Sequence, residues 1–159
     1  MKIKVVAVGR CRETFFTDAC REYEKRLSAY VRTEIVEVKD EALAENASAA
    51  DVRKVLDTEG KRILEKLRDQ DHVIALDLHG DAFDSPGMAE RLQRLMLLGK
   101  SSIVFVIGGS AGLSPEVLAR ADARWSFSKL TFPHQLMRVI LLEQVYRSFR
   151  IINHEPYHK

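Results

Sequence analysis

Two loops in the second half of the chain carry residues suited to holding a small molecule against the backbone. The first, Gly108–Gly112 (GGSAG), follows the apolar run Ile103–Ile107, and the second, Lys129–Pro133, follows Trp125–Ser128. Glycine lets a backbone approach a ligand closely, and ligands of parallel sheets bind beyond the carboxyl ends of the strands. We therefore expect the two loops to lie side by side and to form a binding site between them.

The glycine spacing narrows the class of ligand. It follows G-G-x-x-G, not the G-x-G-x-x-G of dinucleotide sites, and no G-K-[ST] sequence places a lysine on phosphates. A Rossmann-type nucleotide-binding enzyme is therefore disfavoured. Spacing alone also leaves open a tight turn without a ligand, because glycine adopts positive φ at little cost.

A third segment is expected at the same edge of the sheet. The apolar run His72–Leu78 predicts a strand that delivers Leu76, Asp77 and Gly80 close to Gly108. Asp77 is either a carboxylate for a ligand or, more commonly at the end of a strand, a turn residue.

The elements that would position these loops follow from the hydrophobic pattern. Apolar or alternating runs predict strands, and apolar residues spaced by three and four predict helices. The expected strands are 2–8, 31–38, 72–78, 103–107 and 125–128, and the expected helices are 15–30, 52–67, 85–98, 114–122 and 134–150. This alternation predicts a single α/β domain over residues 1–159, with a mainly parallel sheet and helices on both faces.

Local signals mark several helix ends. Ser48 with Asp51 resembles a capping box, Ser85-Pro86 and Ser114-Pro115 resemble starts with a serine N-cap, and Gly60 predicts a bend or a close approach inside its helix. In the last helix, the four apolar residues Val139–Leu142 span too wide an arc for one buried face. We expect the sheet and a second subunit to cover this helix.

Composition excludes several classes of protein. No segment reaches the roughly 18 apolar residues of a membrane span, and Met1–Val6 is too short for a signal peptide, so we expect a cytoplasmic protein without a membrane partner. Cys11 and Cys20 lack further ligands at metal spacing, which predicts reduced thiols and no metal.

Residues 101–159 hold seven Lys or Arg against four Asp or Glu, in a chain of net charge +2. If RNA is the substrate, this small surplus favours recognition of its shape over electrostatic capture.

Three separated motifs resemble those of the SPOUT methyltransferase superfamily. They are IGGSAGLS (107–114), SFSKLTFPHQLMRVILLEQVYRSF (126–149) and the terminal PYHK (156–159), and the opening MKIKVVAVG and the chain length agree with them. Within the superfamily, the chain is similar to the enzymes that methylate N3 of pseudouridine 1915 in 23S ribosomal RNA.

The resemblance implies a fold and a cofactor that periodicity does not reveal. It implies that the C-terminal segment threads a loop to form a trefoil knot, an exception to the usual avoidance of knots. It also implies a homodimer and a bent S-adenosylmethionine in the knot. The cofactor-binding positions it implies are Leu76, Gly108, Phe127, Ser128, Lys129, Leu130, Thr131 and Phe132.

The resemblance further implies catalytic roles for Arg147, Tyr157 and His158. It places Arg147 and Lys159 near the RNA. It also places Tyr157 and His158 near the cofactor of the partner subunit. Methyl transfer from a sulfonium needs mainly positioning, but the proton on N3 of the base must leave. From the residues alone, His158 at a chain end is expected to be mobile, and Glu143 and Arg147 are spaced to pair on a helix.

Two functions remain open. The first is an S-adenosylmethionine-dependent methyltransferase that acts on 23S rRNA in the assembled ribosome. The second is a noncatalytic ribosome-associated protein that keeps the same fold, and cofactor binding distinguishes the two.

Overall fold

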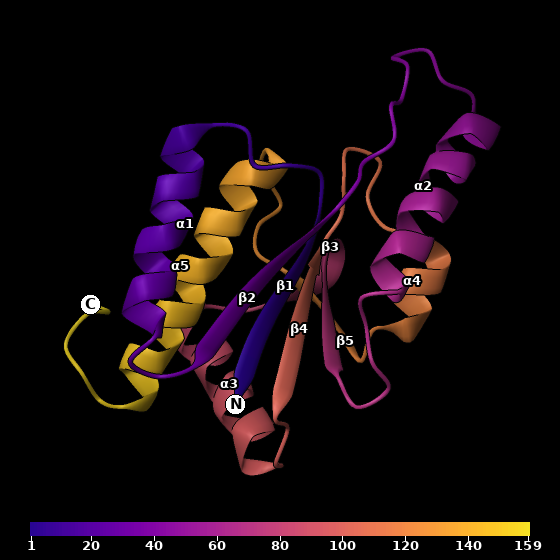
Figure 1. Cartoon of the computed structure of the whole chain (residues 1–159). Helices are drawn as coiled ribbons and strands as arrows, with labels where there is room; N and C mark the ends of the chain where they lie inside the picture. Colours follow the sequence, from indigo (N-terminus) through magenta and orange to yellow (C-terminus); the bar gives the residue numbers. More distant parts are fainter.

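The computed structural model describes all residues, 1–159, and arranges five strands in one parallel sheet of order β2-β1-β4-β3-β5 (Figure 1). This confirms the predicted parallel α/β fold. The elements in chain order are β1 (Lys2–Val8), α1 (Thr14–Leu27), β2 (Arg32–Val38), α2 (Ala49–Leu64), β3 (His72–Ala82), α3 (Ser85–Leu97), β4 (Ser102–Ile107), α4 (Pro115–Arg120), β5 (Ala123–Ser126) and α5 (His134–Ile152).

Helices cover both faces of the sheet, as Figure 1 shows: α1, α3 and α5 lie on one face, and α2 and α4 lie on the other. Successive side chains of a strand point to opposite faces. In β4, Ile103, Phe105 and Ile107 therefore join the core under α1, α3 and α5, while Val104 and Val106 join the core under α2 and α4. The unbroken apolar run of this strand is thus buried on both sides.

The local signals predict most helix ends correctly. Ser48 and Asp51 form the expected capping box, and the Ser114 side chain accepts a hydrogen bond from the N–H of Val117. The N-cap of α3 was predicted one residue late: it is Asp84 and not Ser85, and the Asp84 side chain accepts from the N–H of Gly87. At Gly60 an added Cβ would lie 2.5 Å from Ser114 Oγ, so this glycine allows the close approach of α2 to the start of α4.

Strand β3 is longer than the sequence predicts. It pairs with β5 at Leu76, shifts register and pairs again at Asp81 and Ala82. The shift brings Gly80 against the backbone of Arg124, where an added Cβ would lie 2.6 Å from the Arg124 carbonyl oxygen. Residues 76–79, at the start of this irregular stretch, line the cleft described below.

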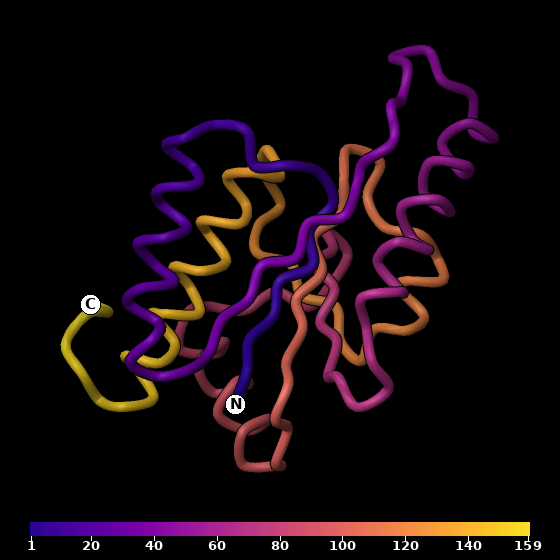
Figure 2. The backbone as a smooth tube through the Cα atoms, viewed as in Figure 1, coloured from indigo at the N-terminus to yellow at the C-terminus, as the bar shows by residue number.

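Helix α5 returns from the edge strand β5 to lie between α1 and α3, and Figure 2 traces this path along the backbone. The two helices flank its wide apolar surface; Leu141 and Leu142 are buried in one chain, whereas Val139 and Ile140 stay partly exposed. On its inner side Arg138 is only 2% exposed. Its guanidinium donates to the Gly9 carbonyl at 2.6 Å and to Glu37 Oε2 at 2.5 Å, which joins α5 to the ends of β1 and β2.

Candidate active site

A cleft of about 660 Å³ opens at the carboxyl edge of the sheet, where three segments meet. They are the turn after Leu76 in β3, the loop that follows β4, and the segment between β5 and α5. The two loops singled out from the sequence do lie side by side. The lining residues fall in the ranges 76–79, 107–113, 125–128 and 130–134, together with Met137.

The loop Gly108–Gly112 folds back on itself in one wall of the cleft. Gly109 and Gly112 form an isolated bridge, the Gly112 N–H donates to the Gly109 carbonyl at 3.0 Å, and Gly112 has φ +89°. A Cβ on Gly108 would lie 2.6 Å from the Gly112 carbonyl oxygen. The glycines are thus required by the shape of the loop itself, and this shape exposes backbone groups to the cleft.

A buried carboxyl group lies behind this loop. Glu59 of α2 is 3% exposed, and a Cβ on Gly109 would lie 3.2 Å from its Oε1, which has no hydrogen-bond partner. Its Oε2 accepts the Glu41 N–H at 3.0 Å. Burial, together with the charges of Asp40 and Glu41, raises the pKa of Glu59 above its ordinary value.

The opposite wall is the segment between β5 and α5. Here Ser126 Oγ donates to the Ser128 carbonyl at 3.2 Å, and the Leu130 N–H donates to Ser128 Oγ at 3.0 Å, so two serines hold the turn. Leu130 is 70% exposed and Phe132 is 37% exposed. Apolar side chains therefore stand open at the mouth of the cleft.

The structure brings seven of the eight predicted cofactor positions to the cleft. They are Leu76, Gly108, Phe127, Ser128, Leu130, Thr131 and Phe132, while Lys129 lies outside its lining. Asp77 also lines the cleft, but its Oδ1 accepts the His79 N–H at 3.3 Å, which is the turn role.

His134, the first residue of α5, lines the cleft although it was not among the predicted cofactor positions. Its ring lies against Gly9, where an added Cβ would be 2.9 Å from Cε1, and its Nδ1 is buried without a partner. Burial and the nearby Arg138 charge lower the pKa of His134, which keeps the ring neutral near neutral pH. The contact joins residues 125 positions apart, so helix periodicity alone did not predict it.

A second group of polar residues lies farther along α5. Arg147 donates to Glu143 Oε1 through Nε at 3.0 Å and Nη2 at 2.5 Å, which confirms the pair expected from their spacing. Tyr157 donates its hydroxyl to the same oxygen at 3.0 Å, and His158 Nδ1 lies 3.2 Å from Arg147 Nη1. Burial and then the Glu143 carboxylate raise the pKa of Tyr157 to about 12, so the phenol stays protonated.

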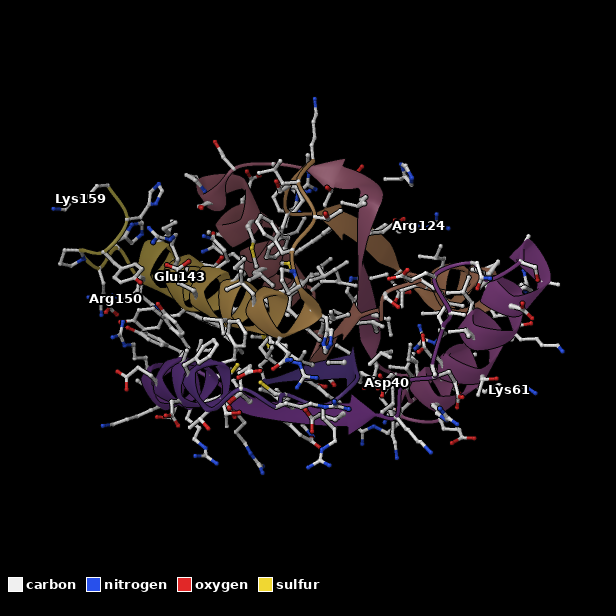
Figure 3. The ribbon with its side chains drawn as sticks, turned by 90° about the horizontal axis from the view of Figure 1, so that it is seen from above. Asp40, Lys61, Arg124, Glu143, Arg150 and Lys159 are labelled. Atoms are coloured by element: carbon white, nitrogen blue, oxygen red, sulfur yellow. The ribbon has the colours of Figure 1, made fainter.

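The C-terminal segment is held against the helices in this structure and is not splayed away from them. Arg150 pairs with Glu155 and donates to the Pro156 carbonyl at 3.0 Å, and the Tyr157 ring packs edge-on against Tyr146. Figure 3 shows Glu143 and Arg150 on α5 with Lys159 at the end of the tail, where Lys159 is exposed. His158 itself is exposed, so its mobility at the chain end stays a prediction.

A second hollow, of about 560 Å³, connects the two groups of residues. It shares Ser126, Phe127, Ser128 and Phe132 with the cleft, and His158 forms part of its wall. The tail of a chain thus reaches the border of that chain's own cleft.

Two further observations concern metal binding and membrane insertion. No group of three or more His, Cys, Asp or Glu side chains is placed to hold a metal ion. None of the helices has the length and apolar character needed to cross a membrane.

Known proteins match this chain over its whole length. Residues 1–158 match the family model described as "Predicted SPOUT methyltransferase". The chain is 56% identical to "Ribosomal RNA large subunit methyltransferase H" of Desulfitobacterium hafniense (strain DSM 10664 / DCB-2), over 100% of this chain and 99% of that protein. It is 50% identical to "Ribosomal RNA large subunit methyltransferase H 1" of Clostridium perfringens (strain SM101 / Type A), over 100% of both.

A solved structure of a probable methylase family protein from Haemophilus influenzae Rd KW20 has the same fold. It superposes with a TM-score of 0.55 at 15% identity, and the match covers 99% of this chain and 70% of that one. At this identity the likeness concerns the fold alone.

Proposed function

We propose that this chain, which belongs to the SPOUT methyltransferase family, transfers a methyl group from S-adenosylmethionine to large-subunit ribosomal RNA. The observation that carries the proposal is the cleft in which the Gly108–Gly112 loop and the segment before α5 face each other. The printed names of the relatives, at 50% and 56% identity over the whole chain, support the RNA substrate.

The residues of the cleft fit this cofactor. Leu76, Phe127 and Leu130 offer apolar walls for an adenine ring, and the backbone of the two loops offers hydrogen-bonding groups for its polar edge. When bound, the cofactor would supply an electrophilic methyl group on a positively charged sulfur. The task of the chain is to hold the cofactor and the nucleophile in line, and such positioning requires no metal.

We propose N3 of pseudouridine 1915 in 23S rRNA as the methylated atom, with the assembled ribosome as substrate and the cytoplasm as the place of reaction. This choice rests on the resemblance of the three motifs. The net charge of +2 supports a structured particle as substrate, because a chain with few excess cations gains little affinity from free RNA phosphates. In this proposal Arg147 and Lys159 face the RNA, and Arg147, Tyr157 and His158 serve the reaction.

We also propose a homodimer and a trefoil knot. The exposed apolar side chains Leu130 and Phe132 at the cleft mouth support a partner surface there. The chain crosses from the edge strand β5 to the start of α5, where His134 lies against Gly9 after β1, and this crossing supports the threading. In the dimer, Tyr157 and His158 would complete the cleft of the partner subunit, whereas within one chain His158 borders its own second hollow.

The test is transfer of a labelled methyl group from the cofactor to ribosomes that lack the modification. We expect transfer to whole ribosomes, and comparison with isolated large subunits and free rRNA identifies the acceptor. If none of these particles is labelled, the proposed function is wrong. A chain that also fails to bind the cofactor by calorimetry would then match the noncatalytic ribosome-associated protein.

A further inference from the structure

Glu59 of α2 is a buried carboxyl group without a counter-ion. The residue is 3% exposed, its Oε2 accepts the Glu41 N–H, and its Oε1 has no hydrogen-bond partner. Arg62, three residues along the same helix, binds Glu41 Oε1 at 2.6 Å and the Lys39 carbonyl at 2.9 Å, and it makes no ion pair with Glu59. A buried carboxylate without a partner lowers stability, and such groups are found where a protein binds a ligand or catalyses a reaction.

This carboxyl group lies directly behind the backbone of Gly109, and Gly109 lines the cofactor cleft. A Cβ on Gly109 would lie 3.2 Å from Glu59 Oε1 and 3.3 Å from Glu59 Oε2. Because glycine has no side chain, both oxygens can approach the backbone of the loop. The carboxyl group is therefore buried against one wall of the cleft.

The charges inside the cleft leave it suited to a positively charged ligand. No lysine or arginine is among its lining residues. Its one acidic side chain, Asp77, lies 4.0 Å from Arg124 Nη1, which offsets the charge of that carboxylate. Burial and the Arg138 charge lower the pKa of His134, so this ring is neutral near neutral pH. The lysines and arginines of the chain therefore do not oppose the charge of Glu59 from within the cleft.

The free oxygen of Glu59 would suit two roles. The N–H groups of Gly109 and Ser110 donate to no acceptor within the protein, so Oε1 could accept one of them when the loop holds a ligand. Such a hydrogen bond would serve any ligand, charged or neutral. The charge of the carboxylate, in contrast, favours a cation, and an amide oxygen would accept the hydrogen bond without the cost of burying a charge.

Resting on the proposed methyltransferase function, we infer that Glu59 determines specificity for the charge of the ligand. Its carboxylate favours the positively charged sulfonium of S-adenosylmethionine over the neutral sulfur of S-adenosylhomocysteine, the product that methyl transfer leaves. The two molecules differ by one methyl group and one positive charge. A fixed anion in surroundings of low polarity discriminates between them, so the site retains the cofactor and releases the product.

Protonation of Glu59 should abolish this preference. The pKa of Glu59 is raised above 4.5, first by burial and further by the charges of Asp40 and Glu41, while the Glu41 N–H and Arg62 lower it. These are the charged groups that face it from the segment after β2 and from α2, and the Gly108–Gly112 loop contains none. A bound cation stabilises the carboxylate, so the preference for S-adenosylmethionine should increase as the pH rises through this pKa.

Calorimetric binding of both molecules to the unaltered protein and to Glu59→Gln tests the inference. Glutamine has the same shape and keeps an oxygen for the Glu41 N–H, but it has no charge. We expect the ratio of the two affinities to fall about tenfold in Glu59→Gln, through weaker binding of S-adenosylmethionine. Glu65→Gln removes an exposed carboxylate at the end of the same helix, and as the matched control it should keep the ratio within about twofold.

A pH series gives a second measurement, which does not depend on the folding of a variant. In the unaltered protein the ratio of the two affinities should rise between about pH 4.5 and about pH 8, as Glu59 ionises. Ionisable groups that the two ligands share cancel in this ratio. Glu59→Gln should lack the part of the rise that Glu59 causes, and comparison of the two proteins removes the contribution of His134, which both contain.

The outcomes distinguish this inference from the proposed function. If the unaltered protein binds neither molecule, the proposed function fails and the inference fails with it. If it binds both, and Glu59→Gln loses affinity for both equally, Glu59 only shapes the loop and the charge role is wrong. An unchanged ratio in Glu59→Gln, or a ratio in the unaltered protein that does not vary with pH, likewise overturns the inference.

Discussion

Gly108 and Gly112 are in such close contact that a Cβ atom on Gly108 would lie 2.6 Å from the Gly112 carbonyl oxygen and 2.8 Å from its carbonyl carbon. Real Cβ atoms do not approach backbone this closely, so Gly108→Ala must open the loop. We expect calorimetry to show at least a tenfold loss of S-adenosylmethionine affinity, about 1.4 kcal/mol. Unchanged affinity would show that the loop does not form the cofactor site.

Gly99 is the matched control for that substitution. It follows α3, has φ +77°, and an added Cβ there would meet nothing within 4 Å. Gly99→Ala should lower the free energy of unfolding by about 1 kcal/mol through backbone strain. Its cofactor affinity should be that of the unaltered protein.

Deleting Tyr157–Lys159 should separate catalysis from folding. The segment contributes one half-buried ring and surface contacts, so we expect a loss of about 1–2 kcal/mol in stability. Cofactor affinity should change little, while methyl transfer to ribosomes should fall at least 100-fold, because Tyr157 and His158, which we propose serve the reaction, are gone. A truncated chain with full activity would show that the tail has no part in the reaction.

Mixing two inactive variants tests whether the tail serves the partner subunit. Gly108→Arg, whose side chain has no space beside the Gly112 backbone, should abolish cofactor binding, and the truncation removes the tail. If the tail acts across the dimer, a mixed dimer has one complete site, and activity should return after the two chains are co-refolded or coexpressed. If each tail serves its own cleft, as the second hollow of one chain would allow, the mixture stays inactive and the proposed exchange between subunits is wrong.

Glu59 gives a prediction for stability as a function of pH. Burial raises the pKa of Glu59 above 4.5, so its contribution to stability is fully present below pH 4.5 and is lost as the pH rises through the folded-state pKa. Near neutral pH the buried carboxylate is a cost. Glu59→Gln keeps an oxygen for the Glu41 N–H and should raise the free energy of unfolding at neutral pH by about 1 kcal/mol, with no gain below pH 4.5.

Denaturant unfolding at several pH values measures this effect. Glu65→Gln, at the exposed end of the same helix, is the control, and it should change stability by no more than about 0.5 kcal/mol. A Glu59→Gln protein that is less stable than the original at neutral pH would mean that the carboxylate stabilises the loop region.

Local patterns predicted the elements well because each depends on neighbours in the sequence. The run Ile103–Ile107 is a strand buried on both faces, and Ser114 caps its helix, both as expected. The end of β3 depends instead on Gly80 meeting Arg124 across the sheet, and no local pattern contains that information. The spacing of apolar residues likewise does not determine the strand order β2-β1-β4-β3-β5.

The candidate site also contains residues that local patterns predicted and residues that they did not predict. Gly108 and the segment Lys129–Pro133 were singled out because glycine and proline mark loops at strand ends, and all of these residues except Lys129 line one cleft. His134 and Arg138 were not predicted in their places, since they contact Gly9, which is more than 120 residues away in the chain. The second hollow depends on α3, α5 and the tail together, and it became visible only with the fold.

The most direct test of the central claim is a crystal structure of the protein with S-adenosylmethionine bound. We predict that the cofactor lies between the backbone of Gly108 and the segment Phe127–Phe132. The crystals should be grown at a cofactor concentration well above the Kd measured in solution. A cofactor bound at any other surface in these crystals would contradict the proposed site.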